Sequence, residues 1–252
     1  MTGSATISAF LAFCAQGNPR FIHPIPERTS YEQMLVDLEN GDPAVRTAFN
    51  WAKQAQNAGD EAVLAEWRRY AAAERASIRR VVTVRHQFDP PPSADALAGL
   101  QLRLGDASPD LLELYRQHDG ASLFVDTEDD GSGLFFFPVA EMDMEREGVA
   151  ERLDAPPMET VEDNQLQVFG KPAWFGSAVV FAGFGYAPER LLLPTTGEYR
   201  GHVFLFTHDP PRLVRICDSL GALLDLLRQR PVELLGDFGG ASYHGASAYQ
   251  TG

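Results

Sequence analysis

The chain has 252 residues, of which 44% are hydrophobic and 10% aromatic, so it can bury a core as one large domain or two small ones. It carries 21 Lys and Arg against 35 Asp and Glu, a formal net charge of −14. This acidity disfavours nucleic acids and anionic membranes as partners, because both bind basic protein surfaces. The two cysteines, Cys14 and Cys217, lie too far apart in the sequence for a metal or redox motif, which favours a reduced intracellular chain.

The apolar run ISAFLAFCA at residues 7–15 is interpreted as an amphipathic helix. A secretory signal is the alternative, but no Lys or Arg precedes the run, and Phe13 stands before Cys14, where signal cleavage needs a small residue. No apolar stretch approaches the roughly 18 to 20 residues that span a membrane. The sequence therefore predicts a cytoplasmic protein.

Apolar residues recur at helical spacing over residues 30–85, for example Tyr31, Leu35 and Leu38. Three consecutive prolines at residues 90–92 end this pattern, because proline cannot continue a helix and forces the preceding residue into extended geometry. We therefore predict a helical N-terminal region over 1–90 and a second domain over 93–235. The remaining residues, 236–252, are rich in Gly, Ser and Tyr and predict a loosely ordered tail.

The second domain is predicted to combine helices with an antiparallel sheet. A short helix falls at 95–100, and Ser108 followed by Pro109 is typical of a helix start, with Gly120 at the end of that helix. Ser219 begins a leucine-rich final helix that Pro231 ends. Between these helices, β-rich runs and turn compositions alternate at the spacing of a meander. The predicted strands are residues 134–139, 178–184, 191–194, 202–207 and 213–217.

Charge is unevenly distributed along the chain. Residues 1–105 hold 11 acidic and 11 basic residues, residues 106–163 hold 17 and 3, and residues 164–252 hold 7 and 7. The whole net charge therefore belongs to the middle segment. Two interpretations stay open: a solvated acidic face that aids solubility, or a surface that attracts a basic partner or cations.

Four segments, taken in order, carry a resemblance to a known family. They are SPDLLELYRQHDGASLF at 108–124, LFFFPVAEM at 134–142, FGSAVVFAGFGYAPERLLLPT at 175–195 and GHVFLFTHDPPRLVRICDSLGALLDLL at 201–227. The chain from about residue 93 to 235 therefore resembles the SUKH superfamily, the Smi/Knr-like group of bacterial immunity proteins and fungal cell-wall-synthesis regulators. The resemblance implies an α+β fold, with a SUKH-like antiparallel β-meander sheet packed with helices. It also implies a binding module without catalysis, since bacterial members typically bind and neutralise a cognate toxin, often a nuclease.

No pattern in the sequence predicts catalysis or a metal site. The acidic loop at 126–133 resembles a calcium loop, but its twelfth position is Phe137, where an EF-hand places a bidentate Glu. His202 and His208 would lie on one face of a strand about 20 Å apart, too far to share a metal. Neither cysteine has a local base motif, and no Gly-Xaa-Ser-Xaa-Gly elbow is present. We therefore predict no catalytic residue, no metal and no cofactor.

The combined interpretation is an immunity protein that occludes a cognate toxin or another basic protein, with no nucleic acid or membrane as partner. Two aromatic residues at a Gly-rich turn, Phe184 and Tyr186, are the predicted interface anchors. Two alternatives remain, a regulatory scaffold of the Smi/Knr type that binds other proteins and an uncharacterised hydrolase. The acidic candidates that would steer the encounter with a basic partner are Asp126, Glu128, Asp129, Asp130, Glu141, Asp143, Glu145 and Glu147.

Overall fold

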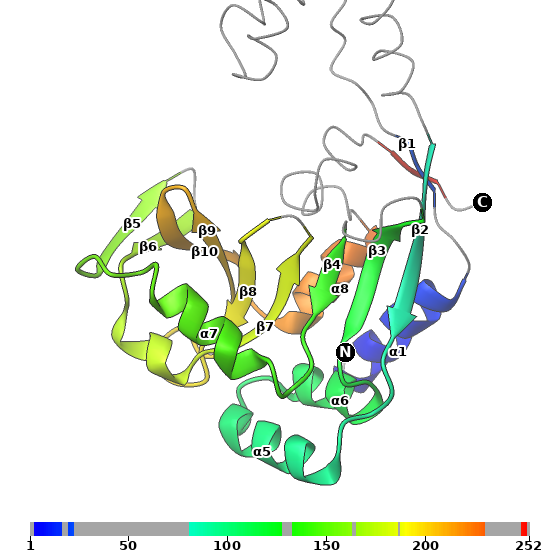
Figure 1. The fold of residues 1–252 in the computed structure, drawn as a ribbon, viewed down its shortest axis with the longest axis horizontal. Coiled ribbons are helices and arrows are strands. Elements are labelled where there is room, and N and C mark those ends of the chain that lie inside the picture. The colour runs from blue at the N-terminus through cyan, green and yellow to red at the C-terminus, as the bar shows by residue number, and fades with distance from the viewer. Residues whose placement is uncertain are drawn as a thin grey trace, which may run out of the picture.

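Figure 1 shows the computed structural model of the chain, which describes residues 3–16, 20–22, 81–127, 133–162, 165–185, 187–229 and 248–250. The predicted helices between residues 30 and 80 lie outside the described residues. The helices are α1 (Gly3–Ala15), α5 (Ala94–Leu104), α6 (Pro109–Gln117), α7 (Met142–Ala150), α8 (Leu220–Gln229) and the 3-10 helix η1 (Ala173–Ser177). The strands are β1 (Arg20–Ile22), β2 (Val81–Phe88), β3 (Ala121–Asp126), β4 (Leu134–Phe136), β5 (Met158–Glu162), β6 (Gln165–Phe169), β7 (Val179–Phe184), β8 (Arg190–Leu193), β9 (Val203–His208), β10 (Pro211–Cys217) and β11 (Ala248–Gln250).

The strands form one antiparallel sheet in the order β11-β1-β2-β3-β4-β7-β8-β9-β10-β6-β5. Strands β7 to β10 are neighbours both along the chain and across the sheet, which confirms the predicted meander. Strands β4 and β7 are neighbours in the sheet, although a long segment of the chain separates them in sequence. The segment between them carries α7, β5, β6 and η1, and its β5–β6 hairpin joins the far edge of the sheet next to β10. The α+β prediction is therefore confirmed.

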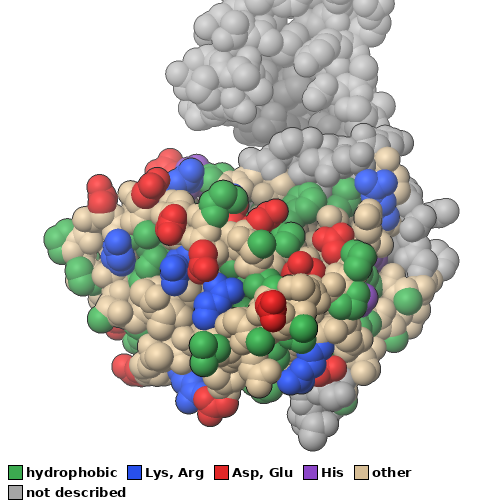
Figure 2. Space-filling view, turned by 60° about the horizontal axis from the view of Figure 1, so that its bottom comes forward, with side chains coloured by type: hydrophobic (Ala, Val, Ile, Leu, Met, Phe, Trp, Pro, Cys, Tyr) green, Lys and Arg blue, Asp and Glu red, His purple; other side chains and the backbone are tan. Residues whose placement is uncertain are grey.

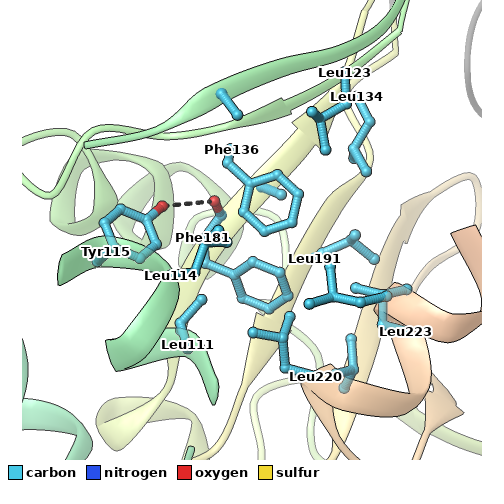
Figure 3. Packing of buried hydrophobic residues seen from close by; sticks show 14 of the residues in the cluster. Leu111, Leu114, Tyr115, Leu123, Leu134, Phe136, Phe181, Leu191, Leu220 and Leu223 are labelled. Carbon is cyan, nitrogen blue, oxygen red and sulfur yellow. Dashed lines mark hydrogen bonds between the residues drawn. The ribbon is translucent and has the colours of Figure 1, made fainter. Parts of the chain in front are cut away.

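Helices cover both faces of this sheet, and each cover encloses its own cluster of buried side chains. The first cluster joins α1, α5, α6 and α8 to one face, and Figure 3 shows part of it. The second cluster joins α7 and η1 to the opposite face. In Figure 1, α7 lies in front of the sheet and α8 behind it. Every residue of β7 is buried, with Phe181 in the first cluster and Val180 in the second.

The predicted helical N-terminal region over 1–90 is corrected at its end. Residues 81–88 form strand β2, although helical spacing was expected as far as Arg85. The run Val-Val-Thr-Val at 81–84 is β-branched at every position, and such residues favour a strand over a helix. The helix predicted at 7–15 is confirmed as α1, whose Ile7 and Phe10 are buried against α6 and α8. The predicted boundary at residue 90 thus runs through one hydrophobic core.

Local capping signals located the helix starts of the second domain. Ser108 Oγ accepts a hydrogen bond from the Leu111 N–H at 3.3 Å, and Pro109 occupies the first turn of α6. Ser219 Oγ accepts one from the Ala222 N–H at 3.2 Å at the start of α8. These two predicted starts are confirmed. The helix expected at 95–100 is confirmed as part of α5, which is longer at both ends.

Several elements were absent from the sequence expectations. The acidic stretch between Met142 and Gln165 is ordered as α7 and the strand β5, and β6 follows it. Met142 and Val149, seven residues apart on one face of α7, are both buried. Strand β4 is shorter than expected and ends before Pro138, which has no N–H for the ladder. The tail predicted as loosely ordered contains β11, which pairs with β1.

The hydroxyl of Tyr115 holds α6 to the strands from inside the first cluster. It donates a hydrogen bond to the carbonyl oxygen of Phe137 at 2.6 Å. The carbonyl oxygen of Phe181 lies 3.5 Å from the same hydroxyl, and Figure 3 shows this second contact as a dashed line. Tyr115 has no exposed surface. Water therefore cannot replace the hydroxyl as a donor to the Phe137 carbonyl.

We predict that Tyr115→Phe lowers the free energy of unfolding by about 1–3 kcal/mol, because it leaves a buried acceptor without its donor. Tyr199→Phe is the matched control. The Tyr199 hydroxyl donates to Glu159 at 3.0 Å in an exposed position, so its loss should cost less than about 0.5 kcal/mol. Urea unfolding at neutral pH measures both values. Equal losses in the two variants would contradict the role assigned to Tyr115.

A largely buried histidine lies where β2, β3 and α1 meet. His86 Nδ1 accepts a hydrogen bond from the Phe124 N–H at 3.3 Å, and its ring stands edge-on to the Phe124 ring at 4.6 Å. Phe13 of α1 lies 6.0 Å from the same ring. Among the described residues, Nε2 has no hydrogen-bond partner. Burial lowers the pKa of His86 from 6.5 to about 4, so the imidazole is neutral at physiological pH.

This pKa predicts a loss of stability in acid. The unfolded chain takes up the His86 proton near pH 6.5, whereas the folded chain takes it up near pH 4. The contribution of His86 is therefore full above pH 6.5, falls as the pH drops to 4, and stays constant below that, a loss of about 2–3 kcal/mol. His86→Asn keeps an acceptor near Nδ1 and cannot titrate. Its free energy of unfolding should therefore fall by about 2–3 kcal/mol less than that of the parent chain as the pH drops from 6.5 to 4. Parallel unfolding curves for both proteins would contradict the assignment.

Candidate protein-binding surface

Four of the acidic residues that the sequence singled out lie in helix α7 or directly before it. Glu141 is the residue directly before the helix, while Asp143, Glu145 and Glu147 lie within it. The buried side of α7, with Val149, packs on the second cluster. Glu141, Asp143 and Glu147 are exposed on its outer side, whereas Glu145 is mostly buried. We name this part of the molecule the α7 surface, made of Leu102, Arg103, Glu141, Asp143, Met144, Arg146 and Glu147.

Asp143 ties α7 to α5. Its Oδ1 atom lies 2.8 Å from an Arg103 guanidinium nitrogen and 3.6 Å from one of Arg146. Arg103 is in the last turn of α5, so the pair joins two helices that are 40 residues apart in sequence. Asp143 is thus shared between two arginines and is not a free negative charge.

Glu145 fixes α7 to the sheet through Arg190, the first residue of β8. Glu145 Oε2 accepts a hydrogen bond from Arg190 Nε at 2.6 Å, and both side chains are mostly buried. The Arg190 guanidinium carbon lies 5.5 Å from the centre of the Phe137 ring, within cation–π distance. A Cβ at Gly183 would approach Phe137 Cζ to 2.7 Å and Arg190 Cδ to 3.0 Å, so only glycine fits beneath this stack.

Arg190 also holds the turn that precedes β8. One of its guanidinium nitrogens donates to the carbonyl oxygens of Ala187 at 3.1 Å and Glu189 at 3.0 Å. The Glu189 carboxylate is buried and pairs with His208 Nδ1 at 2.5 Å, where β9 ends. Helix α7, this turn and the end of β9 are therefore connected by polar contacts around Arg190.

The fold therefore brings arginines onto the acidic segment. Arg103 and Arg190 come from the two segments with no net charge and pair with Asp143 and Glu145. Figure 2 shows that the basic side chains on this part of the molecule stand among acidic ones and not apart from them. Glu141 and Glu147 are exposed and have no ion pair within the described part of the chain. These two are the acids that α7 leaves available to a partner.

The remaining predicted contacts divide into one correction and several residues that stay untested. Phe184 was expected as an exposed anchor but is 4% exposed, because its pairing with Leu134 places it in the first cluster. Asp126 ends β3 opposite Val84, and its side chain is not among those described. Glu128, Asp129, Asp130 and Tyr186 lie outside the described residues.

The structure exposes two apolar residues that the sequence expectations missed. Leu102 of α5 is 86% exposed and Met144 of α7 is 61% exposed, each next in sequence to a member of the Arg103–Asp143 pair. On a helix, residues two apart point in nearly opposite directions. Leu102 therefore faces away from buried Leu100 and Leu104, and Met144 faces away from Met142. Helical wheels drawn on these two segments would have revealed both.

The described residues hold neither a metal-binding cluster nor a reactive thiol. No group of three or more His, Cys, Asp or Glu among them is placed to hold a metal ion. Burial raises the pKa of Cys14 to about 12 and that of Cys217 to about 11, so neither thiol forms a thiolate at neutral pH. No helix in the described ranges has the length and apolar character that crossing a bilayer requires.

Comparison with known proteins gives one match. A model of the SMI1 / KNR4 family (SUKH-1) matches residues 91–226, more than half of the chain. The matched range begins just before α5 and ends within α8, so it includes α7, the meander and the whole α7 surface. Neither the curated proteins nor the solved structures contain a match to this chain.

We predict that the two carboxylates Glu145 and Glu147 differ sharply in structural importance. Glu145→Gln should lower the free energy of unfolding by about 1–2 kcal/mol, because it leaves a mostly buried Arg190 without its counter-charge. Glu147→Gln removes the same charge from an exposed position two residues away and should cost less than about 0.5 kcal/mol. Urea unfolding midpoints of both variants check this. Coinciding midpoints would show that Glu145 does not anchor α7.

Proposed function

The chain belongs to the SMI1 / KNR4 family (SUKH-1), and on that premise we propose that it is an immunity protein, which binds a cognate basic toxin domain and blocks its active cleft. The family match over residues 91–226 carries this proposal. SUKH proteins generally bind other proteins without catalysis, and many are immunity proteins. The sequence predictions of a basic partner and of neutralisation by occlusion are retained here as proposals.

The α7 surface supplies the chemistry that such a partner needs. The unpaired carboxylates of Glu141 and Glu147 attract a basic domain over several ångströms and speed the encounter. Leu102 and Met144 offer apolar contact area that slows dissociation once the partner is seated. Because the Arg103–Asp143 pair is already formed, its side chains lose little further freedom on binding.

The direct test is a calorimetric titration of the full chain against the toxin-like domain encoded by the neighbouring gene. It is run at about 50 and 300 mM salt, where the screening length differs by more than twofold. The proposal expects tight binding that weakens as salt rises. Absence of heat at both salt concentrations, for a toxin domain shown to be folded, would contradict it.

Charge reversal on α7 gives a sharper prediction. Glu141→Lys with Glu147→Lys should slow association about tenfold at low salt and flatten its salt dependence, while leaving stability nearly unchanged. The control is Glu113→Lys with Asp225→Lys, which changes the net charge equally on α6 and α8, across the sheet. Because each of these acids pairs with an arginine three residues further on, urea unfolding first checks that this double variant is folded. Association rates measured by stopped flow distinguish the two double variants. Equal slowing in both would mean that net charge acts without the α7 surface.

The same titration can address the other predicted acids and the scaffold alternative. Asp129→Lys with Asp130→Lys tests the acidic residues at 128–130 in the same way. A second variant omits residues 23–80. Ile22 and Val81 are paired across β1 and β2, so a two-residue Asn-Gly turn can connect them directly. Retained toxin binding by this variant supports the immunity proposal. Lost binding with an intact fold would transfer recognition to residues 23–80, as a scaffold requires.

A further inference from the structure

Strand β5 forms one edge of the sheet. It is the last strand in the sheet order and pairs with β6 through all five of its residues, from Met158↔Phe169 to Glu162↔Gln165. No other described strand pairs with it. In an antiparallel strand, alternate residues direct N–H and C=O groups away from the partner strand. The outer side of β5 therefore presents backbone donors and acceptors without a strand to receive them.

Three of the devices that protect sheet edges, a lysine, a proline and a bulge, are missing from β5. The sequence Met-Glu-Thr-Val-Glu holds no Lys and no Pro, and its register with β6 contains no bulge. Met158 is 56% exposed and Val161 is 73% exposed. Since side chains alternate along a strand, these two residues lie on opposite faces. An incoming strand would therefore find apolar contact on both faces of β5.

The edge is firmly positioned despite its exposure. Val168 of β6 is fully buried in the second cluster, and β6 pairs on its other side with β10. The chain entering β5 crosses directly over Gly170, where a Cβ would come within 2.2 Å of the Ala155 carbonyl oxygen. The Gly170 φ of +67° is also one that favours glycine. A partner would therefore bind a preformed edge, at little cost in ordering β5.

Charge around the edge indicates what would bind there. Strand β5 itself carries Glu159 and Glu162 and no Lys or Arg, and over residues 152–171 of the sequence four acidic residues outnumber two basic ones, Arg152 and Lys171. We propose that the outer edge of β5 docks an extended, Lys- and Arg-containing segment of a partner protein, which adds to the sheet as a further antiparallel or parallel strand. Backbone hydrogen bonds supply affinity, and basic side chains beside the acids supply selectivity. The proposal holds for any basic extended segment and does not depend on the toxin of the preceding section.

A second copy of the chain is a poorer occupant of the same edge. Pairing β5 with β5 would bring two strands together that each carry two glutamates and no base. Like charges across adjacent strands are destabilising. A basic partner meets the same backbone groups and removes this repulsion.

The test uses the isotopically labelled full chain and a synthetic probe, a nine-residue capped peptide of alternating Lys and Val. At about 1 mM peptide, NMR shift changes should concentrate at residues 158–162, and amide exchange on the outer edge of β5 should slow about fivefold. Two control peptides isolate the cause. One replaces Lys by Glu, and the other methylates every backbone nitrogen while keeping the charge. Neither should bind, because one lacks complementary charge and the other lacks strand hydrogen bonds.

Variants complete the test. Val161→Lys places a basic, edge-protecting side chain on β5 and should weaken peptide binding about tenfold, whereas Val161→Thr keeps a β-branched residue and should bind nearly as well as the parent chain. Absence of shift changes at 158–162, or equal binding of the methylated peptide, would overturn the proposal. So would a concentration-dependent dimer, seen by sedimentation, that Val161→Lys dissolves. Because no toxin is used, the outcome is independent of the immunity experiment.

Discussion

The central strands β7, β8 and β9 are buried on both faces, and this double burial determines where the other elements can lie. A strand with two buried faces is apolar at consecutive positions, as VVFAGF in β7 and VFLF in β9 are. Two apolar sheet faces need two covers, because exposed apolar area of that size is unfavourable. Helices α1, α6 and α8 provide one cover and α7 with η1 the other. Helix α7 is therefore required by the core, however acidic its sequence.

An acidic helix packed on an apolar sheet keeps most of its charges on the outer side, and the fold uses some of its acids to hold the helix in place. Asp143 and Glu145 pair with Arg103 and Arg190, which arrive from α5 and β8. The negative field of the α7 surface is consequently weaker than the sequence charge count implies. What remains for recognition is the pair of exposed carboxylates Glu141 and Glu147 with exposed Met144 between them in sequence, and exposed Leu102 beside Arg103, a mixed surface typical of specific protein contacts.

Features determined by local chemistry could be predicted from the sequence, and features determined by register or by distant partners could not. Ser108 and Ser219 revealed their helices because a cap acts within four residues. The meander strands were predictable from their apolar runs and turns. Phe184 was misjudged because its glycine neighbours indicated a turn, whereas its pairing with Leu134 buries it. The ion pairs of α7 could not be foreseen, since Arg103 lies 40 residues from Asp143 and becomes its neighbour only in the folded chain.

Both proposed binding surfaces draw on the same stretch of chain, the segment between the adjacent strands β4 and β7. That segment could be a short turn, because β4 and β7 are antiparallel neighbours. Instead it supplies α7 to one sheet face and the β5–β6 hairpin to the far edge. Its inward residues Val149 and Val168 complete the second cluster, so they tolerate little change. Its outward residues Glu147, Met158 and Val161 are exposed, and substitutions at exposed positions usually change stability little. Partner specificity can therefore change within this segment by substitution of outward residues while the core that holds it stays the same.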